Sequence, residues 1–133
     1  KYINKVINLS KNSKSIQFIG KLSEIQKSEF FEKINILLLP STNSFEAFGI
    51  VQIEAMNFGN LVIASALNGV KIPVSLTKNG LICKINDHED LAIKMIELIE
   101  IGKSKNKIEV INSCNKIFDY SESEKKYLEL FTS

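Results

Sequence analysis

The sequence has few of the residues that build metal sites, disulfide frameworks and membrane spans. It holds two cysteines, one histidine and no tryptophan in 133 residues. Cys83 and Cys114 stand far apart without a C-x-x-C pair, and His88 is the single histidine, so we expect neither a zinc site nor a disulfide framework. Reduced thiols of this kind fit a cytoplasmic protein best. No apolar run reaches the ~18 residues that a bilayer crossing needs.

An excess of charge of one sign is also lacking. There are 17 basic and 15 acidic side chains, a net charge of +2, and no block of like charges. Such a chain has no long-range field to gather nucleic acid, so we expect no nucleic-acid partner. A composition of 44% hydrophobic and 24% charged residues fits one soluble globular domain. The chain begins at Lys1 without an initiator methionine, and we expect it to be a piece of a longer protein.

Hydrophobic spacing predicts helices that alternate with strands. The expected strands are residues 15–19, 36–39, 61–65 and 81–85. The expected helices are residues 1–10, one opened by a Ser23/Gln26 capping box, 49–58, 87–102, 105–118 and one opened by a Ser121/Glu124 capping box. This order predicts an α/β fold, a parallel sheet of about four strands with helices on both faces. Strands 36–39 and 61–65 are the most apolar and should be central, and the other two should be edges.

Three loops follow the predicted strands, where open α/β sheets bind ligands: residues 20–22, 40–48 and 66–71. The second loop leads into a helix and carries two carboxylates, Glu46 in the loop and Glu54 two turns into the helix, both able to face one crevice. Carboxylates accept hydrogen bonds from sugar hydroxyls. Free N–H groups around Phe48, Gly49 and Ile50 would suit an anion such as phosphate.

A second interpretation of the same segment is purely structural. Glu46 would cap the helix and Glu54 would be solvated, while Ile50, Ile53 and Met56 face the core. The surrounding residues favour the functional interpretation. They are Pro40-Ser41, Glu46-Ala47-Phe48-Gly49, Glu54-Ala55-Met56, Gly59, Val62-Ile63-Ala64 and Asn79-Gly80-Leu81.

In this order and spacing, these residues resemble the C-terminal donor-binding domain of GT-B glycosyltransferases of family 4. Phe18-Ile19-Gly20 and the tail from Phe118 are similar to further parts of that domain, and Leu61 stands where the family usually has proline. The resemblance implies a Rossmann-like fold. In the family's strand order, a chain that starts before the third strand lacks the central pair, so we expect an incomplete sheet with unpaired edges.

The resemblance also implies a function, retaining transfer of a hexosyl group from a nucleotide-diphosphate sugar to a glycan or lipid-linked acceptor. This chain would supply one partial donor-binding domain, and the acceptor would be bound by an N-terminal domain that it lacks. Glu46 would contact the transferred sugar, with a catalytic role, and Glu54 the ribose. Phe48, Gly49 and Ile50 would contact the donor through their backbone, and Gly20, Lys21 and Leu22 would border the base. Ser41 follows Pro40 at a strand end, where it would either contact the donor phosphate or cap the loop.

No metal or other cofactor is expected. We expect a cytoplasmic enzyme whose isolated fragment is inactive, and Lys125, Lys126 and Tyr127 leave contact with the inner face of the membrane open. The alternatives are a non-catalytic nucleotide-sugar-binding module, or partner subunit of a split enzyme, and a general nucleotide-binding interaction domain. We interpret His88 as part of a solvated first helical turn and both cysteines as packing residues.

Overall fold

The computed structural model describes residues 2–11, 13–119 and 121. Within it the chain divides into two compact units, Lys1–Phe30 and Phe31–Ser133.

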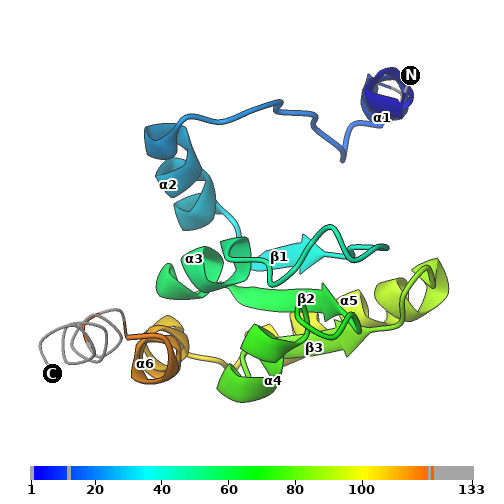
Figure 1. The fold of residues 1–133 in the computed structure, drawn as a ribbon. Helices are drawn as coiled ribbons and strands as arrows, with labels where there is room; N and C mark the ends of the chain where they lie inside the picture. Colours follow the sequence, from blue (N-terminus) through cyan, green and yellow to red (C-terminus); the bar gives the residue numbers. More distant parts are fainter. Residues whose placement is uncertain (1, 12, 120, 122–133) are drawn as a thin grey trace, which may run out of the picture. The chain divides into compact units, whose positions relative to one another are not determined.

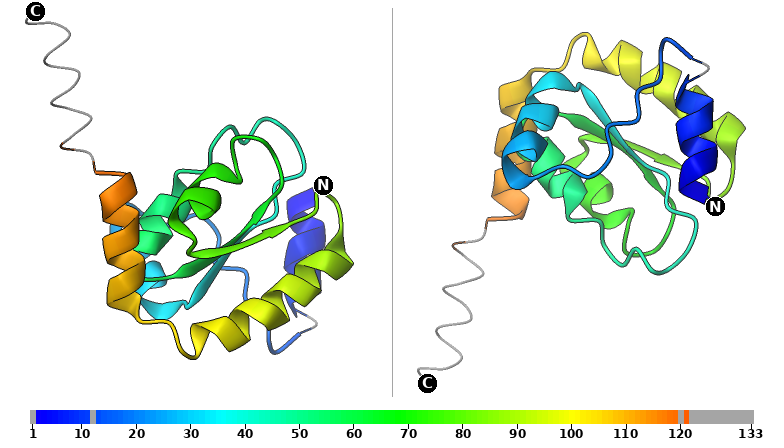
Figure 2. Two further views of the ribbon diagram at one scale, coloured as in Figure 1. Left: turned by 90° about the horizontal axis from the view of Figure 1, so that it is seen from below. Right: turned by 90° about the horizontal axis from the view of Figure 1, so that it is seen from above.

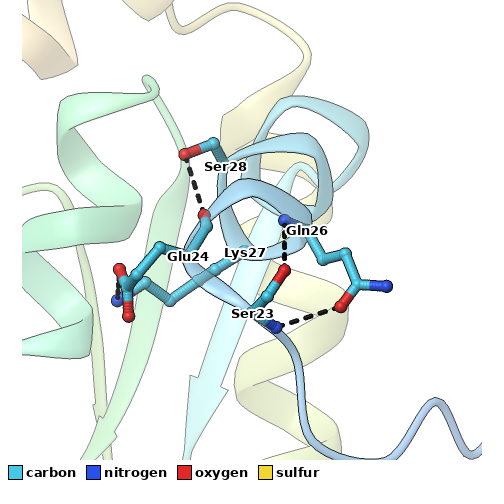
Figure 3. A network of polar contacts seen from close by, with 5 residues as sticks. All are labelled: Ser23, Glu24, Gln26, Lys27 and Ser28. Carbon is cyan, nitrogen blue, oxygen red and sulfur yellow. Dashed lines mark hydrogen bonds and ion pairs between the residues drawn. The ribbon is translucent and has the colours of Figure 1, made fainter.

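The first unit contains α1 (Tyr2–Lys11) and most of α2 (Glu24–Lys33) (Figure 1). The predicted capping box at the start of α2 is confirmed, because the Ser23 N–H donates to Gln26 Oε1 at 3.0 Å and the Gln26 N–H donates to Ser23 Oγ at 3.3 Å (Figure 3). Glu24 and Lys27 form an ion pair at 2.9 Å in the same turn. Local sequence thus fixes where α2 begins.

The prediction of a strand at residues 15–19 is wrong, since they form no strand in the structure. A strand exists only where a neighbouring backbone completes its ladder of hydrogen bonds. Among the described residues, no segment provides such a ladder for residues 15–19. Alternating apolar side chains, such as those of Phe18 and Ile19, do not replace these bonds.

The second unit is built on a parallel sheet of β1 (Ile36–Leu39), β2 (Leu61–Ser65) and β3 (Gly80–Cys83), in the order β1-β2-β3 (Figure 1). The sheet therefore has three strands rather than about four. β2 is central as predicted and buried along its whole length, whereas β1 lies at an edge and is half-buried. The prediction that β1 is central is wrong for the described residues, because the expected strand at 15–19 is absent from the sheet.

Helices cover both faces of this sheet, as predicted. α3 (Val51–Asn57) and α4 (Ile72–Thr77) lie on one face and α5 (His88–Gly102) on the other (Figure 2). α6 (Lys107–Ile117) packs against α3 and α4. α4 was not predicted, because its Pro73 reads as a loop residue although proline is well tolerated in the first turn of a helix.

The core of the second unit forms around β2. Val62, Ile63 and Ala64 of β2 are fully buried, as are Met56 of α3 and Leu98 of α5, the two helices that contact β2. Burial of these apolar side chains stabilises the second unit. The predicted cap of α5 is confirmed, because Asp87 accepts a hydrogen bond from the Asp90 N–H at 2.9 Å. The helix predicted from Ser121 onward lies outside the described residues, apart from Ser121 itself. In the part of the chain that is described, no helix has both the length and the apolar content needed to cross a bilayer.

Candidate functional site

Two of the three predicted ligand loops meet at the carboxyl edge of the sheet. Residues 40–50 follow β1, and residues 66–71 follow β2. The loops touch where Gly69 lies against Ala47, so closely that a Cβ built on Gly69 would stand 1.7 Å from the Ala47 carbonyl oxygen. Only a residue without a side chain fits there, and the structure thus brings the loop of Glu46 against the loop after β2.

The start of α3 depends on Gly49. This residue has a φ of +76°, which is outside the helical region, and the first α-helical hydrogen bond runs from the Glu54 N–H to the Ile50 carbonyl at 3.1 Å. α3 therefore begins at Val51 and not at Gly49. The expectation that Glu54 lies two turns into the helix is wrong, because Glu54 lies in the first turn.

The structural alternative for this segment is also corrected. No side chain caps α3 at Ile50, so Glu46 is not a helix cap. Ile50 is 68% exposed and does not face the core. The buried row of α3 is Gln52, Ala55 and Met56, a spacing that turns Glu54 away from the core, and both Glu46 and Glu54 are half-buried.

The backbone between Phe48 and Ile50 offers hydrogen-bond donors. Within the described residues, the N–H groups of Phe48, Gly49 and Ile50 donate no hydrogen bond. Ile50 is exposed, Phe48 is half-buried and Gly49 is buried. Since α3 has only 7 residues, its dipole is small, and any role in binding oxygen atoms rests on these N–H groups themselves.

The Phe48 side chain packs away from this edge onto the end of α6. Its ring meets the ring of Phe118 edge to face, with 6.2 Å between centroids and 77° between planes. This contact links the Glu46 loop to the start of the chain's tail. The Phe48 ring is therefore engaged in packing.

Gln52 is a residue of the site that sequence reasoning missed. Its side chain is fully buried, and its Nε2 donates to the carbonyls of Phe48 at 3.1 Å and Val70 at 2.9 Å. One amide thus joins the two loops. The signal in the sequence was a polar residue in the same helical row as Ala55 and Met56.

The other predicted donor contacts lie in different places. Ser41 is half-buried and lies two positions after the end of β1, between Pro40 and Thr42 in the chain. Gly20, Lys21 and Leu22 precede α2 in the first unit, where Gly20 has a φ of +71°, Lys21 is exposed and Leu22 is half-buried.

A hollow of about 220 Å³ opens at the carboxyl ends of β1 and β3. It is lined by residues of the loop after β1 and by the entry to α5: Pro40, Thr42, Cys83, Lys84, Asn86, Asp87, His88 and Leu91. His88 is exposed, which confirms that it belongs to a solvated first turn. The described residues contain no group of three or more His, Cys, Asp or Glu side chains arranged to hold a metal ion.

Both cysteines are buried and free of disulfide bonds. Burial raises the pKa of the Cys114 thiol to about 11 and is also the main cause of the raised pKa of Cys83. Thiols with raised pKa values are poor nucleophiles at neutral pH. The structure thus agrees with their interpretation as packing residues.

The second unit is an open parallel α/β sheet in which two loops meet at the carboxyl edge. The family model described as Glycosyl transferases group 1 matches residues 1–111, and the chain belongs to this family. The chain is 34% identical over 88 residues to an uncharacterised glycosyltransferase of Methanocaldococcus jannaschii, a match that covers 66% of this chain and 24% of the relative.

A solved structure shares the fold. The chain superposes on a sucrose-phosphate synthase from Thermosynechococcus elongatus with a TM-score of 0.79 and 23% identity, over 98% of this chain and 34% of that chain. The chain thus spans about a quarter of the curated relative and about a third of the solved structure. The likeness confirms the α/β fold of the GT-B type.

Proposed function

We propose that this chain is the donor-binding part of a glycosyltransferase, in the C-terminal domain of a family 4 enzyme. The observation that carries the proposal is the meeting of the Glu46 loop, the loop after β2 and the first turn of α3 with Glu54 at one edge of the sheet. Family membership and the fold support it. The donor is a nucleotide-diphosphate sugar, and the acceptor is a glycan or a lipid-linked sugar bound by another part of the enzyme.

Each group at this edge has a task in such a reaction. The Glu46 carboxylate accepts hydrogen bonds from hydroxyls of the transferred hexose, and the Glu54 carboxylate accepts those of the ribose. The N–H groups of Phe48 to Ile50, with Ser41, face the sugar and the diphosphate. Apart from the groups at this edge, residues Gly20 to Leu22 of the first unit contribute contacts to the base, a role taken from the family resemblance. Two half-buried carboxylates thereby select a ligand rich in hydroxyl groups.

The reaction retains the configuration at the anomeric carbon. The bond from that carbon to the diphosphate oxygen breaks, and its electron pair leaves with the diphosphate. The acceptor hydroxyl oxygen bonds to the carbon on the same face, and its proton passes to the leaving oxygen. Glu46 stabilises the positive charge that develops on the sugar ring, which is its catalytic contribution. No metal ion or other cofactor takes part, and the enzyme works in the cytoplasm or at the inner face of the membrane.

The test uses the intact protein that contains this chain. A panel of nucleotide sugars scored by thermal shift identifies the donor, because a ligand that binds only the folded state raises the melting temperature. Glu54→Gln is expected to raise the KM for the donor about 10-fold, the loss of one charged hydrogen bond. Glu46→Gln is expected to lower kcat/KM by about 10²-fold. NMR of the first product should show retained configuration, and EDTA should leave the rate unchanged.

Glu109→Gln is the matched control, because Glu109 lies in the first turn of α6 and is exposed. It should behave as wild type. Wild-type kinetics in both Glu46→Gln and Glu54→Gln would show that the site is elsewhere. Donor binding without transfer by the intact protein would favour the non-catalytic module.

A further inference from the structure

Gln52 is the one described residue whose side-chain amide bonds both loops of the candidate site. It projects from α3 toward the sheet in the buried row with Ala55 and Met56. Both hydrogen bonds come from Nε2, one to the carbonyl of Phe48, four positions before Gln52, and one to the carbonyl of Val70, 18 positions after it. The amide therefore holds the end of the Glu46 loop and the end of the loop after β2 at one point.

Two glycines make room for this arrangement. A Cβ on Gly49 would stand 2.7 Å from Gln52 Nε2 and 2.5 Å from Leu39 Cδ2, so a side chain there would displace the amide. Gly69 brings the loop before Val70 against Ala47. The backbone is shaped around the Gln52 amide on both sides.

The arrangement carries a cost in stability. Gln52 Oε1 is buried and has no hydrogen-bond partner in the structure. A buried acceptor without a partner destabilises the folded state, and a methionine of similar size would avoid that penalty. An arrangement that breaks a rule of core packing next to a functional edge indicates a role beyond packing.

We propose that Gln52 is a positioning residue for the nucleotide-sugar donor, an inference that rests on the proposed function. By fixing the Phe48 and Val70 carbonyls, it sets the orientation of the N–H groups from Phe48 to Ile50 and the height of Glu46 above the sheet. The residue does not touch the donor. Its loss changes how well the donor is held and aligned.

The experiment compares Gln52→Glu and Gln52→Met in the intact protein. The kcat/KM and KM for the donor are measured from about pH 5.5 to about pH 8.5, and each value is expressed as a ratio to the wild-type value at the same pH. A buried carboxyl group takes up a proton more readily than an exposed one, and only its neutral form donates a hydrogen bond to a carbonyl. Gln52→Glu should lose about 10²-fold in kcat/KM at high pH, mainly through KM for the donor, and recover about 10-fold of this at low pH. Gln52→Met should show a similar loss with no recovery.

Division by wild type removes the titrations that both proteins share. The ionisable side chains on the elements around Gln52 are the same in both proteins: Glu46, Glu54, Lys71 before α4, and Cys114, whose thiol faces α3 from α6 with its Sγ 3.9 Å from the Ile53 carbonyl oxygen. Asn57→Met is the matched control, because it replaces an exposed amide at the end of the same helix. It should leave donor KM unchanged at every pH.

Two kinetic outcomes would overturn the inference: wild-type donor KM in Gln52→Met, or a ratio for folded Gln52→Glu that is flat with pH. If both variants fail to fold, the NMR signals of the Gln52 amide in unmodified protein decide. They should exchange slowly with solvent and shift when the nucleoside diphosphate is added, and unshifted signals would refute the inference. A wild-type protein that neither binds nor uses any nucleotide sugar contradicts the proposed function instead, before any Gln52 variant is scored.

Discussion

Gly69→Ala tests the contact between the two loops of the site most directly. The new Cβ would stand 1.7 Å from the Ala47 carbonyl oxygen. Carbon and oxygen atoms in close contact lie about 3.3–3.6 Å apart, so the loops must separate by roughly 1.5 Å or more. Because the oxygen belongs to the backbone, no side-chain rotation relieves the clash. The displaced segment is the one that carries Glu46.

The size of the effect follows from this displacement. A shift of about 1 Å in positioning groups costs about 10²-fold in rate, and we expect at least this loss in kcat/KM for the donor. Overpacking also lowers the free energy of unfolding by about 1–3 kcal/mol. Steady-state kinetics of the intact protein and urea unfolding measure the two effects separately.

Gly102→Ala is the control for this substitution. Gly102 ends α5, and a Cβ there would meet Leu61 Cδ1 at 3.5 Å, an ordinary van der Waals contact. Alanine is also the better helix former, so stability should hold or rise slightly. If Gly69→Ala keeps the kcat/KM and the urea midpoint of Gly102→Ala, the tight approach of the two loops has no bearing on function, and the reasoning is refuted.

Two further predictions concern the packing of α6. Asn79→Leu should lower the free energy of unfolding by about 1–3 kcal/mol in urea melts. The reason is that the buried Asn79 amide donates to the Val110 carbonyl at 3.1 Å and to Ser113 Oγ at 2.7 Å. Ser113→Ala removes only one of these partners and should lower the free energy of unfolding by less. The pKa of Cys114 is raised by burial from 9.0 to about 11, so the unfolded thiol ionises first and stability should fall as the pH rises from 9 toward 11. The urea midpoint of Cys114→Ala should fall less than that of wild type over this pH range. An equal fall in both proteins would contradict the assignment of the effect to the Cys114 thiol.

Features that depend on neighbouring residues in the sequence were predictable. The Ser23/Gln26 capping box and the Asp87/Asp90 cap formed as expected, because each is completed within one helical turn. The apolar run at 61–65 gave the buried central strand. The two loops after β1 and β2 could be placed at one edge because parallel strands end on the same side.

Features that depend on distant residues were not predictable. Residues 15–19 have the alternation of a strand, but strand formation needs a partner that no local pattern supplies. At position 61 the family usually has proline, and the structure shows that the Leu61 N–H donates to the Asn35 carbonyl at 3.0 Å, a bond proline cannot make. Gln52 was missed for the same reason, since its role appears only once Val70 is beside it.

The site therefore depends on residues that carry no reaction chemistry of their own. Gly69 and Gln52 act on the same loop contact, one by allowing close approach and the other by hydrogen bonding across it. Substitutions that break a shared contact are not additive, since the second finds the contact already open. The double variant of Gly69→Ala and Gln52→Met should lose clearly less than the product of the two single losses in kcat/KM. Losses that multiply in full would mean that the two residues position the donor independently, through different parts of the edge.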